Sequence, residues 1–295
     1  METSRYRAMI HAVDEGSLSK AAQVMAYTPS GVSQLVAALE RDLGFPLLER
    51  TKRGVYPTSA GEELMGALRS IIAEEDRLLQ LAAEVKGLST GSVTIGSYPS
   101  VATHWLPRVV KEFHKEFPNI RIQMNEGIHQ EIDEWLGNKE VDLGFISYEE
   151  SMAWDWIPLA EDPMVAVLPC DHPLAKNASF PLEACEDQAF IMPGRGQDID
   201  TLKLLNDHNI HPNVVFDTIE NSSTMAMVEQ GLGISIMNKL VTQRTNFDVA
   251  CIPVEPSSSI TLGIACPSLT SASPAARHFV EFTKPYLTKI NELNS

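Results

Sequence analysis

The sequence predicts an α/β multidomain fold, with a winged helix-turn-helix domain, one long connecting helix and a two-lobed α/β domain. Three observations support this prediction. Two short helical segments joined by a tight turn precede a basic hairpin near the N-terminus. Nearly thirty residues without proline then repeat apolar side chains three and four apart. Beyond the segment GLSTG, strands alternate with helices along the chain, which is typical of a sheet covered by helices.

The first two helices are predicted to support a third. A helix over about 4–14 contributes mainly core residues, and its Arg5 and Arg7 are the side chains placed to reach a phosphate. A second helix begins at Ser19, and the connection Ala26–Tyr27 is short enough for a helix-turn-helix motif.

The third helix is predicted from Thr28 to Gly44. Thr28 suits the N-cap, Pro29 suits the first helical position, and Gly44 ends the segment. Its apolar residues recur three and four apart, so they share a buried face. The opposite face carries small or hydrogen-bonding groups that suit entry into the major groove, and it predicts DNA contacts from Ser30, Ser33 and Gln34.

A basic hairpin is predicted after this helix. Arg50, Lys52 and Arg53 flank Gly54 between two short extended runs, which fits a wing lying along DNA phosphates. Taken singly, the polar helix face also fits solvated surface, and the basic cluster also fits a plain loop. Their order along the chain is more specific than either feature.

These motifs carry a family resemblance. Residues 16–61 read GSLSKAAQVMAYTPSGVSQLVAALERDLGFPLLERTKRGVYPTSAG and resemble the DNA-binding segment of LysR-type transcriptional regulators. The resemblance implies a DNA-binding domain over residues 1–58 and a homodimeric or homotetrameric regulator. Gly31 departs from the usual Ala of the family, which weakens the helix start by roughly 1 kcal/mol.

A linker helix is predicted over residues 59–88. Thr58 or Ser59 caps it, and Ser59 with Glu62 fits a capping box. A single surface helix could show part of the apolar pattern, but its length favours dimerisation, as the resemblance also implies. The predicted seam consists of Leu64, Leu68, Ile71, Glu75, Leu78, Ala82 and Val85.

The remainder, residues 91–295, is predicted to form a mostly parallel sheet with covering helices. Two chain crossings divide it into one lobe of about 91–161 plus 265–295 and another of about 162–264, as in periplasmic binding proteins and the effector-binding domain of the LysR family. Early in this region, one helix is expected over Val101–Phe117. Two lobes of this kind imply a cleft between them.

The cleft is the predicted site of a small-molecule effector. The strand SVTIG leads into a helix start rich in hydroxyl groups, where N–H groups and the helix dipole favour an anion. The resemblance aligns Ser100 with a hydroxyl that contacts the effector, although a simple N-cap role is the alternative. Arg195 suits a carboxylate, or lies in water as a loop arginine, and His129 is a ligand or a capping residue. The candidate effector-binding residues are Ser97, Ser100, Thr103, His129, Ser147, Arg195 and Asn221.

Composition restricts the other function classes. The net charge is −16, but residues 1–60 hold seven Lys or Arg against six Asp or Glu, so the acidity lies outside the predicted DNA-binding domain. The four cysteines are scattered and are interpreted as buried apolar residues, with redox sensing as an alternative. With no catalytic, metal-binding or cofactor motif and no apolar run near 18 residues, we expect a cytoplasmic, non-enzymatic protein without a cofactor and without membrane contact.

Two alternatives to an effector-controlled regulator stay open. The first is a DNA-binding protein without a small-molecule ligand, controlled by redox chemistry or by protein interaction. A filled, apolar cleft would favour it. The second is a solute-binding or enzymatic α/β module fused to a DNA-binding domain.

Overall fold

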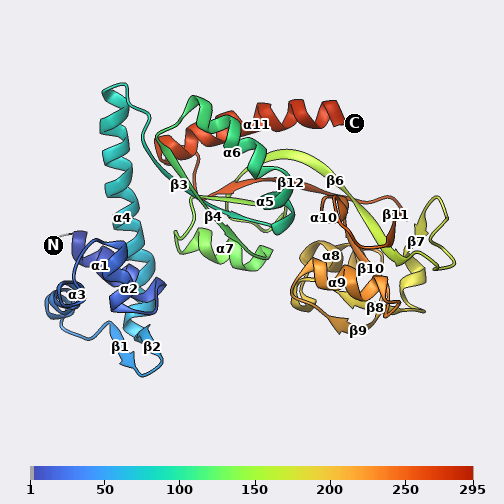
Figure 1. The fold of residues 1–295 in the computed structure, drawn as a ribbon, viewed down its shortest axis with the longest axis horizontal. Helices are drawn as coiled ribbons and strands as arrows, with labels where there is room; N and C mark the ends of the chain where they lie inside the picture. The colour runs from blue at the N-terminus through green and yellow to red at the C-terminus, as the bar shows by residue number, and fades with distance from the viewer. Residues whose placement is uncertain (1–2, 295) are drawn as a thin grey trace.

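The computed structural model describes the backbone of residues 3–294 and the side chains up to residue 289. Met1, Glu2 and Ser295, which the predicted domains include, lie outside the described residues. Figure 1 shows the N-terminal helices at one end, the long helix α4 (Ser59–Val85) beside them, and two α/β bodies joined by long strands. Among residues 3–294, none of the helices combines the length and the apolar character needed to cross a bilayer.

The N-terminal domain is built around one apolar core. Its elements are α1 (Thr3–Asp14), α2 (Leu18–Val24), α3 (Pro29–Leu43), β1 (Leu48–Thr51) and β2 (Gly54–Pro57). Met9, Val32, Val36, Leu39 and Leu47 are fully buried at its centre. The apolar face predicted for the third helix is therefore the face that packs.

Hydrogen bonds from backbone amides to nearby side chains set where α2 and α3 begin. The prediction for α3 is confirmed, since Thr28 Oγ1 accepts a hydrogen bond from the Gly31 amide at 3.1 Å and Gly44 ends the helix with φ 88°. The predicted start of α2 at Ser19 is wrong. Ser17 is the N-cap, because its hydroxyl accepts from the Lys20 amide.

Two arginines of α1 are paired with carboxylates of the protein itself. Arg5 pairs with Asp42 at 2.5 Å, and Arg7 pairs with Glu75 at 3.0 Å and Asp76 at 2.6 Å. The suggested phosphate contacts of these arginines are therefore wrong. The ion pair with Arg7 also explains Glu75, the polar residue in the predicted seam, because this pair joins α4 to α1.

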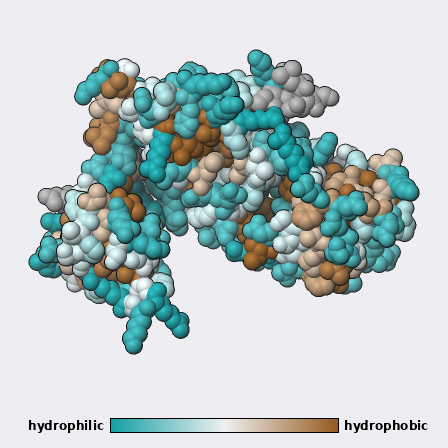
Figure 2. Space-filling view, viewed as in Figure 1, coloured by the Kyte–Doolittle hydropathy of each residue, from teal (hydrophilic) through white to brown (hydrophobic). Residues whose placement is uncertain are grey.

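Helix α4 (Ser59–Val85) has two different halves. Thr58 Oγ1 caps it by accepting from the Gly61 amide, so position N3 is a glycine and the expected Ser59–Glu62 capping box does not form. Leu68 is buried in the N-terminal core, whereas Leu78 and Leu79 are 64% and 62% exposed. Apolar atoms gather on this far part of α4 in Figure 2.

The first α/β body has a sheet flanked by helices. Strands β4, β3, β5 and β12 are adjacent in that order, and β3 runs parallel to both β4 and β5. Its core includes Phe113, Phe145 and Phe279. Its elements are β3 (Gly91–Ser97), α5 (Pro99–His104), α6 (Leu106–Glu116), β4 (Ile120–Glu126), α7 (His129–Gly137), β5 (Leu143–Ser147), β12 (Ser259–Cys266) and α11 (Pro274–Asn294).

The second body has its own core, which includes Phe180, Phe190 and Ile236. Strand β6 pairs antiparallel with β10 and β11, and β8 pairs parallel with β9. Its elements are β6 (Asp155–Pro169), β7 (Phe180–Pro181), the 3₁₀ turns Leu182–Cys185 and Gly194–Gly196, β8 (Ala189–Met192), α8 (Ile199–Asp207), β9 (Asn213–Asp217), α9 (Asn221–Glu229), β10 (Ser235–Asn238), α10 (Lys239–Thr242) and β11 (Val249–Glu255).

The two bodies are joined by β6 and β12, which pair antiparallel with each other. The sheet is therefore mixed, and the prediction of a mostly parallel sheet is wrong. The crossing strands must run in opposite directions, because one leaves the first body and the other returns to it. Leu262 and Ile264 already belong to the first core, so the return crossing lies before them rather than at residues 264–265.

The helix expected over Val101–Phe117 is broken at Trp105 into α5 and α6. Pro107 is the physical reason. It has no N–H to donate to the Thr103 carbonyl, and its ring would clash with that carbonyl in a continuous helix. The segment that faces the cleft is thus a helix of only six residues.

Candidate functional site

The recognition helix and the wing present their polar side chains on one face. Ser30 and Gln34 are exposed on α3, and Arg50 donates a hydrogen bond to Ser33 Oγ at 3.1 Å. This contact joins β1 to α3, so the wing and the helix face the same side. Lys52 and Arg53 form the exposed turn between β1 and β2, which projects from the domain in Figure 1.

The tip of the wing is held by side-chain hydrogen bonds. Thr51 Oγ1 accepts from the Arg53 amide at 3.1 Å and donates to the Gly54 carbonyl at 3.2 Å. Gly54 adopts φ 142°, which glycine tolerates without strain. All six predicted DNA-binding residues thus lie on α3 and the adjoining hairpin, where cations and small polar groups are available to a duplex.

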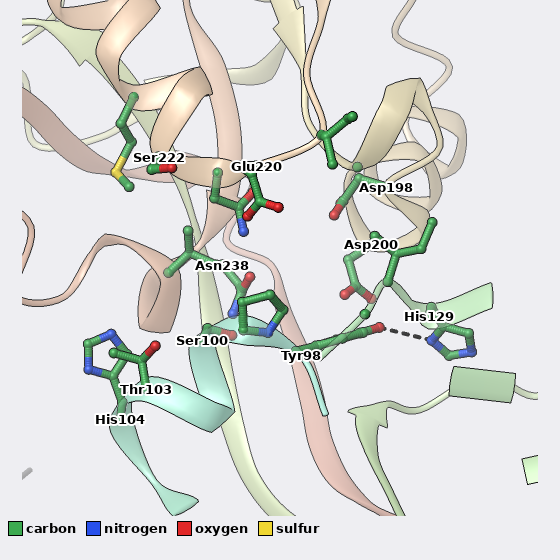
Figure 3. Close-up of a pocket in the computed structure, with 18 of the residues that line it drawn as sticks. Tyr98, Ser100, Thr103, His104, His129, Asp198, Asp200, Glu220, Ser222 and Asn238 are labelled. Carbon is green, nitrogen blue, oxygen red and sulfur yellow. Dashed lines mark hydrogen bonds between the residues drawn. The ribbon is translucent and has the colours of Figure 1, made fainter. Parts of the chain in front are cut away.

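A cavity of about 360 Å³ lies between the two α/β bodies. It is lined from the first body by residues of β3–α5 and the start of α7, and from the second by the starts of α8 and α9 and by the segment around α10 (Figure 3). Four predicted effector residues line it, namely Ser100, Thr103, His129 and Asn221.

The other predicted effector residues take different positions. Ser97 is buried, and its hydroxyl donates to the Tyr98 carbonyl at 2.9 Å. Ser147 is buried beside the cavity and lies 3.0 Å from the Tyr98 hydroxyl. Neither lines the cavity, but both contact Tyr98, which does.

Tyr98 is the centre of a buried network that the sequence did not indicate. Its hydroxyl lies 2.9 Å from His129 Nδ1 (Figure 3). His129 Nε2 lies 3.4 Å from a Glu149 oxygen. Burial raises the pKa of Tyr98 and lowers the pKa of His129. The neutral forms of both rings are therefore favoured near neutral pH.

Arg195 does not reach into the cavity. It lies between Gly194 and Gly196, all three residues have positive φ, and its amide donates to the Thr218 carbonyl at 2.7 Å. Its guanidinium is 55% exposed and lies 3.3 Å from Glu131 of α7. The arginine thus bridges the two bodies beside the cavity, which corrects the expected contact with a ligand carboxylate.

Several charged residues of the cavity were not predicted. Asp198 caps α8, with Oδ1 accepting from the Thr201 amide at 2.9 Å, and Asp200 lies in the first turn of the same helix. Burial and the neighbouring Asp198 raise the pKa of Asp200 to about 7. Arg244 also lines the cavity, and so does Glu220, which belongs to the segment before α9 that was expected to face the cleft. The rule that selected Ser100 and Asn221 at helix starts would have found Asp198 as well.

The charge of the cavity differs from the expected anion site. Its lining holds the carboxyl groups of Asp198, Asp200 and Glu220 and the guanidinium of Arg244. Helix α5 is also short, so its dipole supplies less than the long helix predicted there. The expectation of a simple anionic effector is therefore not supported by the lining.

The cysteines divide into two pairs. Cys185 and Cys266 are buried, and burial raises their pKa values to about 12 and about 11. Cys170 and Cys251 are exposed, contrary to the expectation that all four are buried. A hydrogen bond to Asp248 raises the pKa of Cys170, and partial burial of the thiol raises the pKa of Cys251, which disfavours the reactive thiolate in both. Within the described residues, no three His, Cys, Asp or Glu side chains form a metal-binding group.

A winged helix-turn-helix domain joined to a two-lobed domain with an interlobe cavity defines a DNA-binding regulator with a ligand-binding domain. Comparison with known proteins agrees. Residues 3–62 match the family described as bacterial regulatory helix-turn-helix proteins of the lysR family, and residues 86–288 match the LysR substrate binding domain. The chain belongs to the LysR family of transcriptional regulators.

Proteins named as transcriptional regulators match this chain over most of their length. The chain is 26% identical to the uncharacterized HTH-type transcriptional regulator YvbU of Bacillus subtilis, covering 96% of this chain and 98% of the relative. It is 29% identical to the transcriptional activator CmpR of Synechocystis, covering 81% and 80%. These matches favour the regulator over a fused enzymatic module.

Solved structures share the fold. The effector binding domain of QuiR in complex with shikimate has a TM-score of 0.62 and 26% identity, covering 68% of this chain and 99% of that one. Full-length CbnR in complex with its target DNA has a TM-score of 0.68 at 17% identity, covering 97% and 99%. The second likeness shows the fold alone.

Proposed function

We propose that this regulator binds operator DNA through α3 and the wing, and that an effector bound between its two lobes changes how it binds. The observation that carries the DNA-binding part is the hydrogen bond between Arg50 and Ser33. It fixes the wing against the recognition helix, so base-reading and phosphate-binding groups approach the duplex together. Ser30, Ser33 and Gln34 read bases, and Arg50, Lys52 and Arg53 hold phosphates.

The proposed organisation follows the predicted boundaries, with residues 1–58 for DNA binding, 59–88 for dimerisation and 91–295 for effector binding. The exposed apolar half of α4 supports a homodimer, and two such dimers form a tetramer. Two-fold symmetry then sets two operator half-sites.

The cavity supports control by a small molecule. It is lined by both polar and apolar side chains and is not filled by them, which argues against a ligand-free regulator with a packed cleft. The relative QuiR is described in complex with shikimate, so a related domain is known to hold a small molecule. A ligand that prefers one closure of the lobes would shift the population of DNA-bound geometries.

Two further parts of the proposal rest on the relatives. They are transcriptional regulators, so we assign the chain no catalytic activity and no cofactor. A regulator of bacterial operators acts at the chromosome, so we propose a cytoplasmic location.

The DNA-binding proposal is tested by selecting duplexes from a randomised library with the full-length chain. Arg53→Ala should weaken binding to all sequences, because one phosphate contact is lost. The slope of log affinity against log salt concentration should fall in magnitude by about 1. Ser33→Ala should change preference at particular bases. Lys176→Ala removes an exposed cation of the second lobe and is the control. Equal losses on all sequences for Arg53→Ala and Ser33→Ala would refute the division of roles.

A further inference from the structure

The interlobe cavity carries an unusual charge pattern for a site that would hold a simple acid. Three carboxyl groups come from the second lobe, two from the start of α8 and one from the residue before α9. Figure 3 shows Asp200 close to Tyr98, Asp198 above Asp200, and Glu220 facing them from the left across the same space. A negatively charged ligand group placed there would be repelled by each of these carboxyl groups that is ionised.

Other groups nearby do not offset these carboxyls. His129 and Tyr98 adjoin the acidic end, but burial favours the neutral form of each ring. Arg195, the nearest cation predicted from sequence, is paired with Glu131 outside the cavity. The acidic end therefore requires a positively charged partner or retains a proton.

The opposite end of the cavity has the other sign. Arg244 lines the cavity with His104, and its charge helps to lower the pKa of that histidine after the larger effect of burial. In Figure 3, His104 and Thr103 lie at the far side of the space from Asp200. The cavity is thus polarised, with carboxyl groups at one end and a guanidinium at the other.

We propose that the effector of this regulator carries a protonated amino group, which binds among Asp198, Asp200 and Glu220. Arg244 suits a carboxylate at the other end of the same molecule, so an amino acid fits the polarity better than a diamine. This inference rests on the proposed role of the cleft as the effector site, and it replaces the simple anion expected from the sequence.

The ionisation of Asp200 supplies a signature of this binding mode. Its pKa is about 7, raised by burial first and then by Asp198, Glu149 and Asp162, and opposed by the Ser147 hydroxyl. An ammonium group favours the carboxylate form, so binding near pH 7 releases about half a proton. An anionic ligand group favours the protonated form, so its binding takes up a proton.

The experiment is isothermal titration of the full-length chain with matched probe pairs that differ only in the amino group. Suitable pairs are L-alanine with L-lactate, L-glutamate with L-2-hydroxyglutarate, L-phenylalanine with L-phenyllactate, and 1,4-diaminobutane with 1,4-butanediol. We expect an amino member to bind at least tenfold more tightly than its hydroxy partner. Its affinity should be about tenfold higher at pH 8 than at pH 6, since the fraction of ionised Asp200 changes by that factor. Two buffers of different ionisation enthalpy measure the proton released, and this readout needs no variant.

Matched variants locate the amino group. Asp200→Asn and Glu220→Gln keep the side-chain shape, and each should lower the affinity for the amino probe at least tenfold. Asp200→Asn should also abolish the pH dependence. Asp187→Asn, which changes an exposed carboxylate of the second lobe, is the control and should change neither property.

The outcomes distinguish an amino acid from a polyamine. They also distinguish failure of the ammonium proposal from failure of the proposal that the cleft binds an effector. Binding of amino acids but not of the diamine identifies a zwitterion, and the reverse identifies a polyamine. If a hydroxy acid or shikimate binds with proton uptake and Ser100→Ala abolishes that binding, the ammonium proposal is wrong while the effector cleft stands. If no amino compound binds at millimolar concentration, the ammonium proposal is also wrong.

Discussion

Asp200 shows how burial of one side chain controls both ligand chemistry and stability. An unfolded aspartate has a pKa near ~3.9, whereas the folded protein raises that of Asp200 to about 7. Between these values the folded state holds a proton that the unfolded state has lost. The stability contributed by this group therefore falls as the pH rises from about 4 to about 7.

Replacing the Asp200 carboxyl group with an amide, which does not titrate, should remove this loss of stability at higher pH. We expect Asp200→Asn to match the parent in unfolding temperature near pH 4 and to exceed it at pH 8. The gain is at most about 4 kcal/mol, because each pKa unit corresponds to roughly 1.4 kcal/mol. Differential scanning calorimetry at the two pH values measures it, with Asp187→Asn as the control. An equal gain at both pH values would contradict a buried ionisation.

At the scale of elements, α4 joins two functions in one helix. Its first half packs on the N-terminal core, and its second half leaves leucines exposed. The second half is also held to two different partners, since Arg7 of α1 pairs with Glu75 and Gln80 accepts from the Ala275 amide of α11. The helix is thus in contact with both the DNA-binding and the effector-binding parts.

Two glycines of α4 form a matched pair for testing its packing. A Cβ at Gly61 would overlap the carbonyl oxygen of Leu47, whereas a Cβ at Gly66 meets nothing within 4 Å. We expect Gly61→Ala to destabilise the N-terminal domain by about 1–3 kcal/mol through overpacking. Gly66→Ala should stabilise it by up to about 1 kcal/mol through helix propensity. Thermal unfolding followed by circular dichroism distinguishes them, and destabilisation by both variants would contradict the open space beside Gly66.

The exposed half of α4 should control self-association. Leu78→Asp places a charge in the proposed dimer seam, and burying an unpaired carboxylate is costly. We expect the dimer dissociation constant to rise at least about tenfold, which corresponds to roughly 1.4 kcal/mol. Sedimentation equilibrium measures it. Leu232→Asp, at an exposed leucine of the second lobe, is the control, and an equal effect there would argue against the seam.

At the scale of the whole molecule, the two lobes touch through several contacts, which include the packing of α10 against α5. The ion pair between Arg195 and Glu131 is one of them. Since both side chains are partly open to water, the pair should contribute no more than about 1 kcal/mol to closure.

Arg195→Ala should therefore change the affinity for a cleft ligand by less than about fivefold, the equivalent of 1 kcal/mol. Glu131→Gln should have a similar effect, and the double variant should show little more than either. Titration with a probe that binds the parent measures these changes. A loss of about a hundredfold for Arg195→Ala alone would show that the arginine reaches the ligand, as the sequence first indicated.

Sequence patterns predicted the elements whose causes are local. The cap at Thr28 and the end at Gly44 follow from side chains and glycine within a few residues of the backbone they affect. Four of seven effector candidates also line the cavity, because they lie at strand ends and helix starts. The break at Trp105 was missed although Pro107 was visible in the sequence.

Other features depended on partners far along the chain. The acidic seam residue Glu75 is explained by its contacts with Thr3 and Arg7 of α1, and Arg195 pairs with Glu131 outside the cavity. The mixed sheet follows from the pairing of β6 with β12, about a hundred residues apart.

The sequence by itself determined the family, the helix-turn-helix with its wing, and the existence of two lobes, because motif spacing and hydrophobic periodicity are local properties of the chain. Only the tertiary structure decided the charge of the cavity. Asp198, Asp200, Glu220 and Arg244 come from separate segments, and their mutual distance and burial set which ligand charge is favoured. Electrostatic preference is a property of the assembled site, since it depends on separation and solvent exclusion rather than on residue type alone.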